Sequence, residues 1–164
     1  MTREPKNPRV ILLEDHHHIE TLLERLIATI RSSDREAGER AWRKIEDVLL
    51  RHLDVEEMFV FPPLHEGHAA EVDRLRREHD AIRKAIGEIG LALELHTLRC
   101  ETLESFCTML REHAQREDSL AYVLAGRTLS IGIMRAIGSR LKAAVTNLQA
   151  PRKRASRRAS GVPS

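Results

Sequence analysis

The stretch His52-Leu-Asp-Val-Glu56 places a histidine and a glutamate four residues apart. In an α-helix this spacing puts both side chains on one face, a single turn apart, so that both can point at the same spot. The stretch His113-Ala-Gln-Arg-Glu117 repeats the arrangement. One such pair is common by chance, whereas a repeated pair indicates that the four side chains share a partner.

Each copy of the motif is preceded by one histidine on an apolar seam, which is His16 for the first copy and His79 for the second. The spacings to the motif histidines are 36 and 34 residues. All six side chains lie on seams where apolar residues recur every three or four positions, as on a helix that faces a bundle core. A polar side chain in such a seam costs roughly a few kcal/mol unless it is paired. Six of them at matched positions predict a two-metal centre.

The four seams predict four helices, and the residues of each seam form the face that is expected to point into the core. They run as Leu12, His16, Ile19, Leu23, Leu26 and Ile30; Trp42, Ile45, Leu49, His52, Glu56 and Phe59; Val72, Leu75, His79, Ile82, Ile86, Ile89 and Leu93; and Leu103, Phe106, Leu110, His113, Glu117, Leu120 and Leu124.

The composition favours an all-α fold. Aromatic residues make up only 3% of the chain, against 41% apolar and 32% charged residues. Together with the seams, this predicts an up-down-up-down four-helix bundle. Since 164 residues suit a single domain, we expect one bundle domain at 1–149, with its core at about 10–125.

The histidine positions also predict the turns, because residues equidistant from a turn lie at the same height in antiparallel helices. The midpoint between the first two histidines is Asp34, and the midpoint between the next two lies at 65–66, among prolines and a glycine. The third midpoint is His96, where Thr97 is a candidate helix cap. The four histidines should therefore meet at one level of the bundle.

A fifth helix is predicted at about 128–149, with an apolar stripe that would pack across the bundle or form a homo-oligomer. Residues 150–164 hold five basic residues and no acid, so removing them turns the net charge of +2 into about −3. We expect this segment to be a disordered, solubilising tail, and we do not expect it to bind nucleic acid.

Two further observations concern location. No apolar run reaches the length of about 18 residues that a membrane span needs, and the N-terminal residues do not form a secretory signal. The two cysteines, Cys100 and Cys107, are too few for a disulfide framework and suit reduced thiols. We therefore expect a cytoplasmic protein.

Imidazole and carboxylate ligands together suit iron, manganese or zinc. The seams offer no thiolate ligands, which argues against a structural zinc finger or an iron–sulfur cluster. His17 and His18 lie beside the first seam and are expected to be exposed. Glu14-x-x-His17 is the one Glu-x-x-His in the chain, whereas ferritin-like di-iron proteins need this motif twice, so that fold is disfavoured.

The motifs resemble those of the hemerythrin-like HHE cation-binding domains. The matching stretches are Asp15-His16-x-x-Ile19, His52-x-x-x-Glu56-Glu57-x-x-x-Phe61-Pro62, Glu78-His79-x-x-Ile82 and His113-x-x-x-Glu117-Asp118. The resemblance implies a four-helix bundle that holds a non-haem di-iron centre. In such a centre the two glutamates bridge two iron ions, and an oxo or hydroxo group lies between the ions.

One departure from the family pattern bears on the function. The oxygen-carrying hemerythrins have a fifth histidine one turn from the third-helix ligand, where this chain has Leu75 and Arg83. Two coordination positions would then stay open instead of one, which suits a centre that reacts with small oxidants. The leading hypothesis is catalase-like decomposition of hydrogen peroxide under oxidative stress. The alternatives are a module that binds or senses oxygen, nitric oxide or iron without turnover, and a helical bundle that binds no metal.

Polar side chains beside the ligands are candidates for outer contacts. Asp15 and Asp80 could accept the outer imidazole hydrogens and orient the rings. Glu57 and Asp118 point off the seams, and Asp118 is also an alternative ligand, since hemerythrins proper use an aspartate at that spacing. Tyr122 could approach the metal, although packing is the simpler expectation.

Overall fold

The computed structural model describes residues 7–147. Its helices are α1 (Pro8–Arg31), α2 (Arg35–Val55), α3 (Phe61–Glu94), α4 (Cys100–Arg116), α5 (Tyr122–Thr128) and α6 (Ile131–Asn147). Two π-helical turns, η1 (Glu56–Val60) and η2 (Glu117–Ala121), join α2 to α3 and α4 to α5. The described range contains no strand, so the all-α prediction is confirmed. None of its helices is long and apolar enough to span a membrane.

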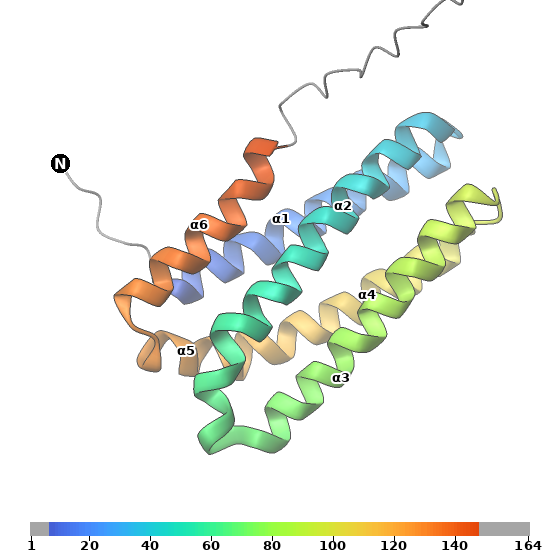
Figure 1. Cartoon of the computed structure of the whole chain (residues 1–164). Coiled ribbons are helices and arrows are strands. Elements are labelled where there is room, and N and C mark those ends of the chain that lie inside the picture. The colour runs from blue at the N-terminus through green and yellow to red at the C-terminus, as the bar shows by residue number, and fades with distance from the viewer. Residues whose placement is uncertain (1–6, 148–164) are drawn as a thin grey trace, which may run out of the picture.

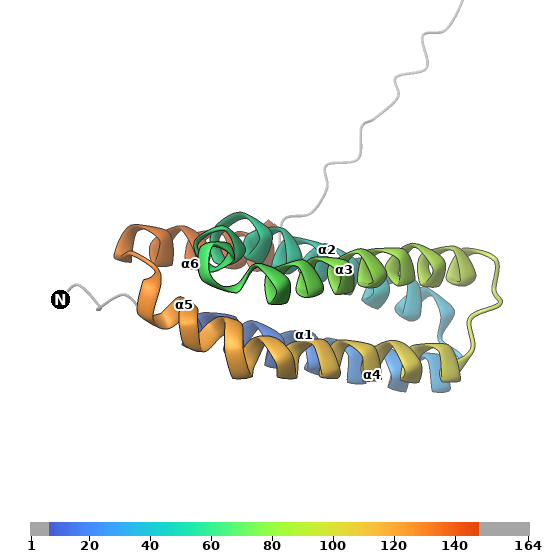
Figure 2. The same cartoon turned by 90° about the horizontal axis from the view of Figure 1, so that it is seen from below.

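The helices α1 to α4 form two layers. Figure 2 shows α2 and α3 in one layer and α1 and α4 in the other. The connections from α1 to α2 and from α3 to α4 lie at one end, while the connection from α2 to α3 lies at the opposite end (Figure 1). Each long helix contacts two others, in the order α1, α2, α3, α4 and back to α1.

Two of the three predicted turns are confirmed. Asp34 is the N-cap of α2, and its carboxylate accepts a hydrogen bond of 3.0 Å from the amide of Ala37. Between α3 and α4, His96 has a left-handed backbone with φ of 59°. Thr97 does not cap α4, because the N-cap of that helix is Arg99. The amide of Thr97 instead donates to the carbonyl of Ala92 at 2.9 Å. It closes the end of α3, and α4 begins after Arg99, which gives no side-chain cap.

The connection between α2 and α3 differs from the prediction. The chain stays helical through Pro62 and Pro63, which occupy the first turn of α3. A proline is tolerated there because the first-turn amides have no partner within the helix. The helical backbone is interrupted at His68 instead, where φ is −138° and ψ is 41°. The reversal is therefore a kink two residues beyond the predicted turn.

The π-helical turns shift the buried face of the chain. In η1 the amide of Phe61 bonds the carbonyl of Glu56, and in η2 the amide of Tyr122 bonds the carbonyl of Glu117. Each turn thus holds one residue more than an α-helical turn. The sequence predicted a buried Phe59, but Val60 and Phe61 are buried instead. It also predicted that Leu120 and Leu124 would be buried, whereas the buried residues are Ala121, Tyr122 and Ala125.

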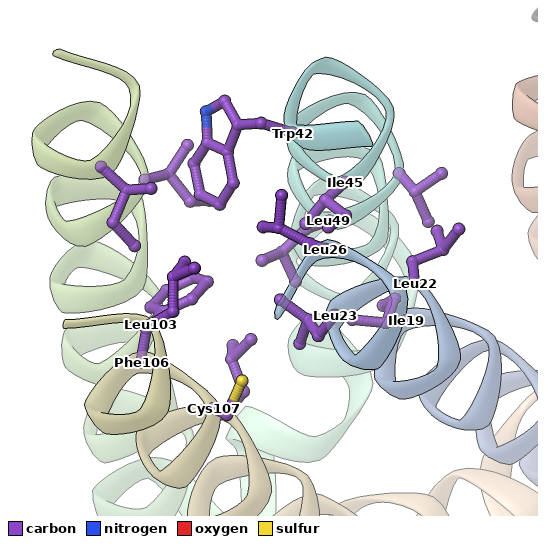
Figure 3. Packing of buried hydrophobic residues seen from close by; sticks show 14 of the residues in the cluster. Ile19, Leu22, Leu23, Leu26, Trp42, Ile45, Leu49, Leu103, Phe106 and Cys107 are labelled. Atoms are coloured by element: carbon purple, nitrogen blue, oxygen red, sulfur yellow. The ribbon is translucent and has the colours of Figure 1, made fainter. Parts of the chain in front are cut away.

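Two apolar clusters fill the interior. The first packs α1 to α4 against one another around Leu26, Trp42, Ile45, Leu103 and Phe106, as Figure 3 shows. The second gathers Leu12, Phe61, Leu75, Tyr122 and Ile137 at the end that carries α5 and α6. The predicted ligand positions fall between the two clusters along every long helix. A polar layer therefore lies between two apolar ones.

Helix α6 contacts α1 and α2. It buries Ile137 and Leu141, and Gly138 comes so close to α1 that a β-carbon there would lie 3.4 Å from Ile11. The guanidinium of Arg140 lies 5.5 Å from the ring centre of Phe59, so α6 also covers η1. The predicted fifth helix is thus present and packs across the bundle, but begins at Ile131.

The end of the predicted fifth helix and the basic segment 150–164 lie outside the described residues. A homo-oligomer through α6 stays a prediction, as does the extent of the single domain.

Candidate metal site

Four histidines and two glutamates converge between the two apolar clusters. Their ligand atoms form two groups, His16–His52–Glu56–Glu117 and Glu56–His79–His113–Glu117, and within each group all atoms lie within 4.8 Å of one another. Each group contains one histidine from each of two helices, and both groups contain both glutamates. The structure thus brings together all six side chains that the sequence predicted as ligands.

The inner nitrogen, Nε2, of each histidine faces glutamate oxygens. His16 Nε2 lies 3.3 Å from Glu117, His52 Nε2 lies 3.2 Å from Glu56, His113 Nε2 lies 3.1 Å from Glu117, and His79 Nε2 lies 3.4 Å from both glutamates. Two ligand atoms at right angles, each about 2.1 Å from a metal ion, are about 3 Å apart. These distances fit a coordination shell.

Burial makes a partner for these atoms necessary. Glu56 and Glu117 are completely buried, and so is His79. Glu56 Oε2 and His113 Nε2 are buried and make no hydrogen bond of good geometry, although other ligand atoms lie 3.4 Å and 3.1 Å from them. Since orphaned buried polar atoms are rare in folded proteins, both atoms are suited to a bound cation. The donor set and its unsatisfied atoms therefore fit a metal site.

The outer nitrogen, Nδ1, of each histidine contacts a carboxylate from the neighbouring helix. The pairs are His52 with Asp15 at 2.7 Å, His79 with Glu57 at 2.8 Å, His113 with Glu78 at 2.9 Å and His16 with Asp118 at 3.0 Å. We call these contacts the outer carboxylate ring, because they run from α1 through α2, α3 and α4 back to α1. A proton held on Nδ1 leaves the lone pair of Nε2 pointing inward, as a metal ligand requires.

The outer carboxylate ring includes three of the predicted outer residues and omits a fourth. Asp80 is exposed and contacts no histidine in the described part of the chain, and Glu78 takes the role expected of it. Glu78 precedes His79 as Asp15 precedes His16, so the internal repeat in the sequence could have identified Glu78 as the outer partner. Asp118 lies at the outer nitrogen of His16, away from the glutamate oxygens.

Arginines neutralise half of the outer carboxylate ring. Arg83 lies 2.7 Å from Glu57, and Arg116 lies 2.9 Å from Glu78. No arginine or lysine pairs with Asp15 or Asp118 among the described residues. Arg83 is one of the two candidate positions for a fifth histidine, and its side chain instead pairs with Glu57 and Asp54.

Titration of these groups reflects their mutual attraction. Burial alone would lower the pKa of His79, but hydrogen bonds to Glu117 and Glu56 raise this pKa to about 10. Burial and the charge of Glu117 alone would raise the pKa of Glu56, but His52 and His79 hold it at about 2. Both glutamates are therefore carboxylates at neutral pH, and they stabilise positive charge between them.

The hydroxyl of Tyr122 lies among the ligand atoms of the first group. It is 3.0 Å from His16 Nε2, 3.4 Å from His52 Nε2 and 3.5 Å from Glu117 Oε2, and it also donates to Glu56. Burial, with the charges of the two glutamates, raises the pKa of Tyr122 well above its usual range. The sequence favoured a packing role for this residue, and the shift of the buried face in η2 explains the difference.

A groove beside α1 and α4 reaches the site from the surface. We call it the α1–α4 groove; its volume is about 530 Å³, and its lining includes His16, His52 and His113. Leu13, Ile19, Leu23 and Leu110 supply much of its apolar wall. Near its rim Arg111 pairs with Glu20 at 2.9 Å. A small apolar molecule could pass from solvent to the ligands by this route.

The other residues discussed from the sequence belong to neither ligand group. His17 is exposed, as expected, and His18 is half-buried. Leu75, the other candidate position for a fifth histidine, is buried in the second apolar cluster. The cysteines Cys100 and Cys107 are both free thiols.

Comparison with protein families gives one match. Residues 7–125 match the family described as the hemerythrin HHE cation-binding domain, which covers most of the chain and all six candidate ligands. Searches among curated proteins and among solved structures return no match. The family resemblance inferred from the sequence motifs is thereby confirmed.

Proposed function

Because this chain belongs to the hemerythrin HHE cation-binding domain family over residues 7–125, we propose that it holds two iron ions. His16 and His52 would bind one ion, His79 and His113 the other, and Glu56 and Glu117 would bridge them. The observation that carries this proposal is that the two ligand groups share both glutamates. An up-down-up-down order of α1 to α4 is part of the proposal, and the positions of the three connections support it (Figure 1).

The iron pair, when bound, would supply redox chemistry toward small oxidants, and the reaction we propose is the decomposition of hydrogen peroxide. The residues of the chain would hold the iron pair and shield it from water. The outer carboxylate ring fixes the proton of each histidine on Nδ1 and the orientation of each imidazole. The apolar clusters on both sides exclude water, which strengthens the attraction between the carboxylates and the cations.

The α1–α4 groove supports a reaction with small molecules, since it connects three of the four histidines with the surface. The absence of a fifth histidine supports the same conclusion. Leu75 offers no ligand atom, and Arg83 is paired with carboxylates. The centre would therefore keep at least one position open for an oxidant.

The test is metal content combined with turnover. Iron-loaded protein should contain about two irons per chain and release oxygen from hydrogen peroxide faster than the same amount of free iron. Glu117→Ala should lose iron and activity together, because both metals would lose a ligand. Asp80→Asn is the matched control, since this exposed side chain contacts no ligand. A fully iron-loaded protein that is no faster than free iron would exclude the enzymatic function.

The alternative is a module that binds or senses oxygen or nitric oxide without turnover. The apolar wall of the α1–α4 groove favours it, because diatomic gases partition into apolar surroundings more readily than peroxide does. A change of the absorption spectrum on addition of nitric oxide, in a protein that does not consume peroxide, would favour this alternative.

A further inference from the structure

The internal repeat is broken at one atom next to the metal site. Tyr122 follows Glu117 by five residues, and Phe61 follows Glu56 by five residues. Each closes a π-helical turn, and each is completely buried. Phe61 packs on the imidazole of His79 with ring centres 5.0 Å apart, and Tyr122 packs on that of His16 at 5.2 Å. The two rings are counterparts, and they differ by one hydroxyl.

This hydroxyl contacts every member of one ligand group. It lies 3.0–3.5 Å from His16, His52 and Glu117, and it donates a hydrogen bond to Glu56. An octahedral ligand has four neighbouring ligands, each about 3 Å away when metal–ligand bonds are about 2.1 Å. The hydroxyl thus occupies the place of a fifth ligand. At the other group, the phenyl ring of Phe61 offers no such atom.

The two ligand groups also differ in how far their outer carboxylates are neutralised by arginines. Glu57 and Glu78, which contact His79 and His113, are both paired with arginines. Asp15 and Asp118, which contact His52 and His16, have no arginine or lysine partner among the residues described. The group that contains the hydroxyl therefore also carries the less neutralised outer carboxylates.

We propose that Tyr122 is a ligand of one metal ion only, the ion held by His16 and His52. This inference rests on the proposed iron centre. When the metal binds, the phenol O–H bond breaks, an oxygen–metal bond forms and the proton leaves to solvent. The phenolate adds one negative charge to that ion and fills its open position. An exogenous ligand then binds to the ion held by His79 and His113.

The chain makes this inference directly testable, because Tyr122 is its only tyrosine. Iron-loaded ferric protein should show a phenolate-to-iron absorption band in the visible region. Its resonance Raman spectrum should contain phenolate ring modes that shift when the protein is produced with ring-deuterated tyrosine. Neither measurement needs a variant.

Tyr122→Phe is the matched variant, since Phe61 shows that a phenyl ring fits the same environment in the other half. It should lose the band and the deuterium-sensitive modes while keeping about two irons per chain. Azide titration should give about one bound azide per iron pair in the natural protein and about two in Tyr122→Phe. Asp80→Asn should behave as the natural protein does.

The outcomes separate the two proposals. Protein with two irons per chain but without deuterium-sensitive modes would overturn the Tyr122 ligand and leave the iron centre standing. Protein that binds less than about one iron per chain would overturn the iron centre, and the ligand with it.

Discussion

Two acidic residues flank His79 and have different environments. Glu78 accepts a hydrogen bond from His113 and pairs with Arg116, whereas Asp80 faces solvent. Their difference follows from helix geometry, because residues two apart point about 200° away from each other around the helix axis. Only Glu78 faces the next helix of the bundle, α4, and can orient the histidine there, His113.

We expect Glu78→Gln to weaken metal binding roughly 10- to 100-fold, because a ligating histidine loses its charged outer partner. The measurement is a competition titration against a chelator, with Asp80→Asn as the control, because Asp80 is also adjacent to His79 in the sequence. Equal affinities in the two variants would contradict an orienting role for the outer carboxylate ring.

At this scale the sequence predicted all six converging side chains, because each is a polar residue in an apolar seam. For the outer contact it named Asp80 and not Glu78, although both are adjacent to His79 in the sequence. Adjacency alone does not say which side of the helix meets a neighbour. The neighbouring helix, α4, settles the choice.

The helices were predictable as elements, but their irregular turns were not. A constant period of 3.6 residues places Leu120 and Leu124 on the core face, whereas the π-helical turn η2 replaces them with Ala121, Tyr122 and Ala125. A π-helical turn has no residue signature comparable to proline or glycine. The shift became visible only with the backbone, and it is what brings the hydroxyl of Tyr122 to the ligands.

The turn between α1 and α2 allows a test of backbone strain. Ser33 has a left-handed backbone with φ of 60°, which costs a residue with a β-carbon roughly 1 kcal/mol. Ser33→Gly should therefore raise the free energy of unfolding by up to about 1 kcal/mol, as measured by urea denaturation. Ser105→Gly, at an exposed site inside α4, is the control and should lower it by about 0.5 kcal/mol. A loss of stability in Ser33→Gly would show that this strain is absent in solution.

On the scale of the whole molecule, the α1–α4 groove connects the buried site with the surface. Ala114 is a half-buried residue of its lining, and a phenyl ring there would narrow the route to His113. We expect Ala114→Phe to slow the reaction of the iron-loaded protein with peroxide or nitric oxide severalfold, without loss of iron. Ala81→Phe, on the exposed face of α3, should leave the rate unchanged. Equal rates in stopped-flow experiments would mean that oxidants enter elsewhere.

The charges of the site link the stability of the whole molecule to pH. Hydrogen bonds to the glutamates raise the pKa of His79 from 6.5 to about 10, against the effect of burial. The stabilisation that comes with this shift is fully present below pH 6.5 and is lost as the pH rises toward 10. The pKa of Glu56 is lowered from 4.5 to about 2, so its stabilisation is present above pH 4.5 and is lost toward pH 2. Protein prepared without metal should therefore be most stable between about pH 4.5 and 6.5.

Metal binding should reverse this dependence above pH 6.5. A metal ion needs neutral histidines, so its binding displaces protons and strengthens as the pH rises. Because a ligand of the folded state stabilises it in proportion to its affinity, the difference in Tm between loaded and unloaded protein should widen from pH 6 to 8.5. Thermal unfolding with and without ferrous iron, under anaerobic conditions, measures this difference. A difference that shrinks over this range would show that the protonated histidines do not compete with the metal, and the six side chains would then not be its ligands.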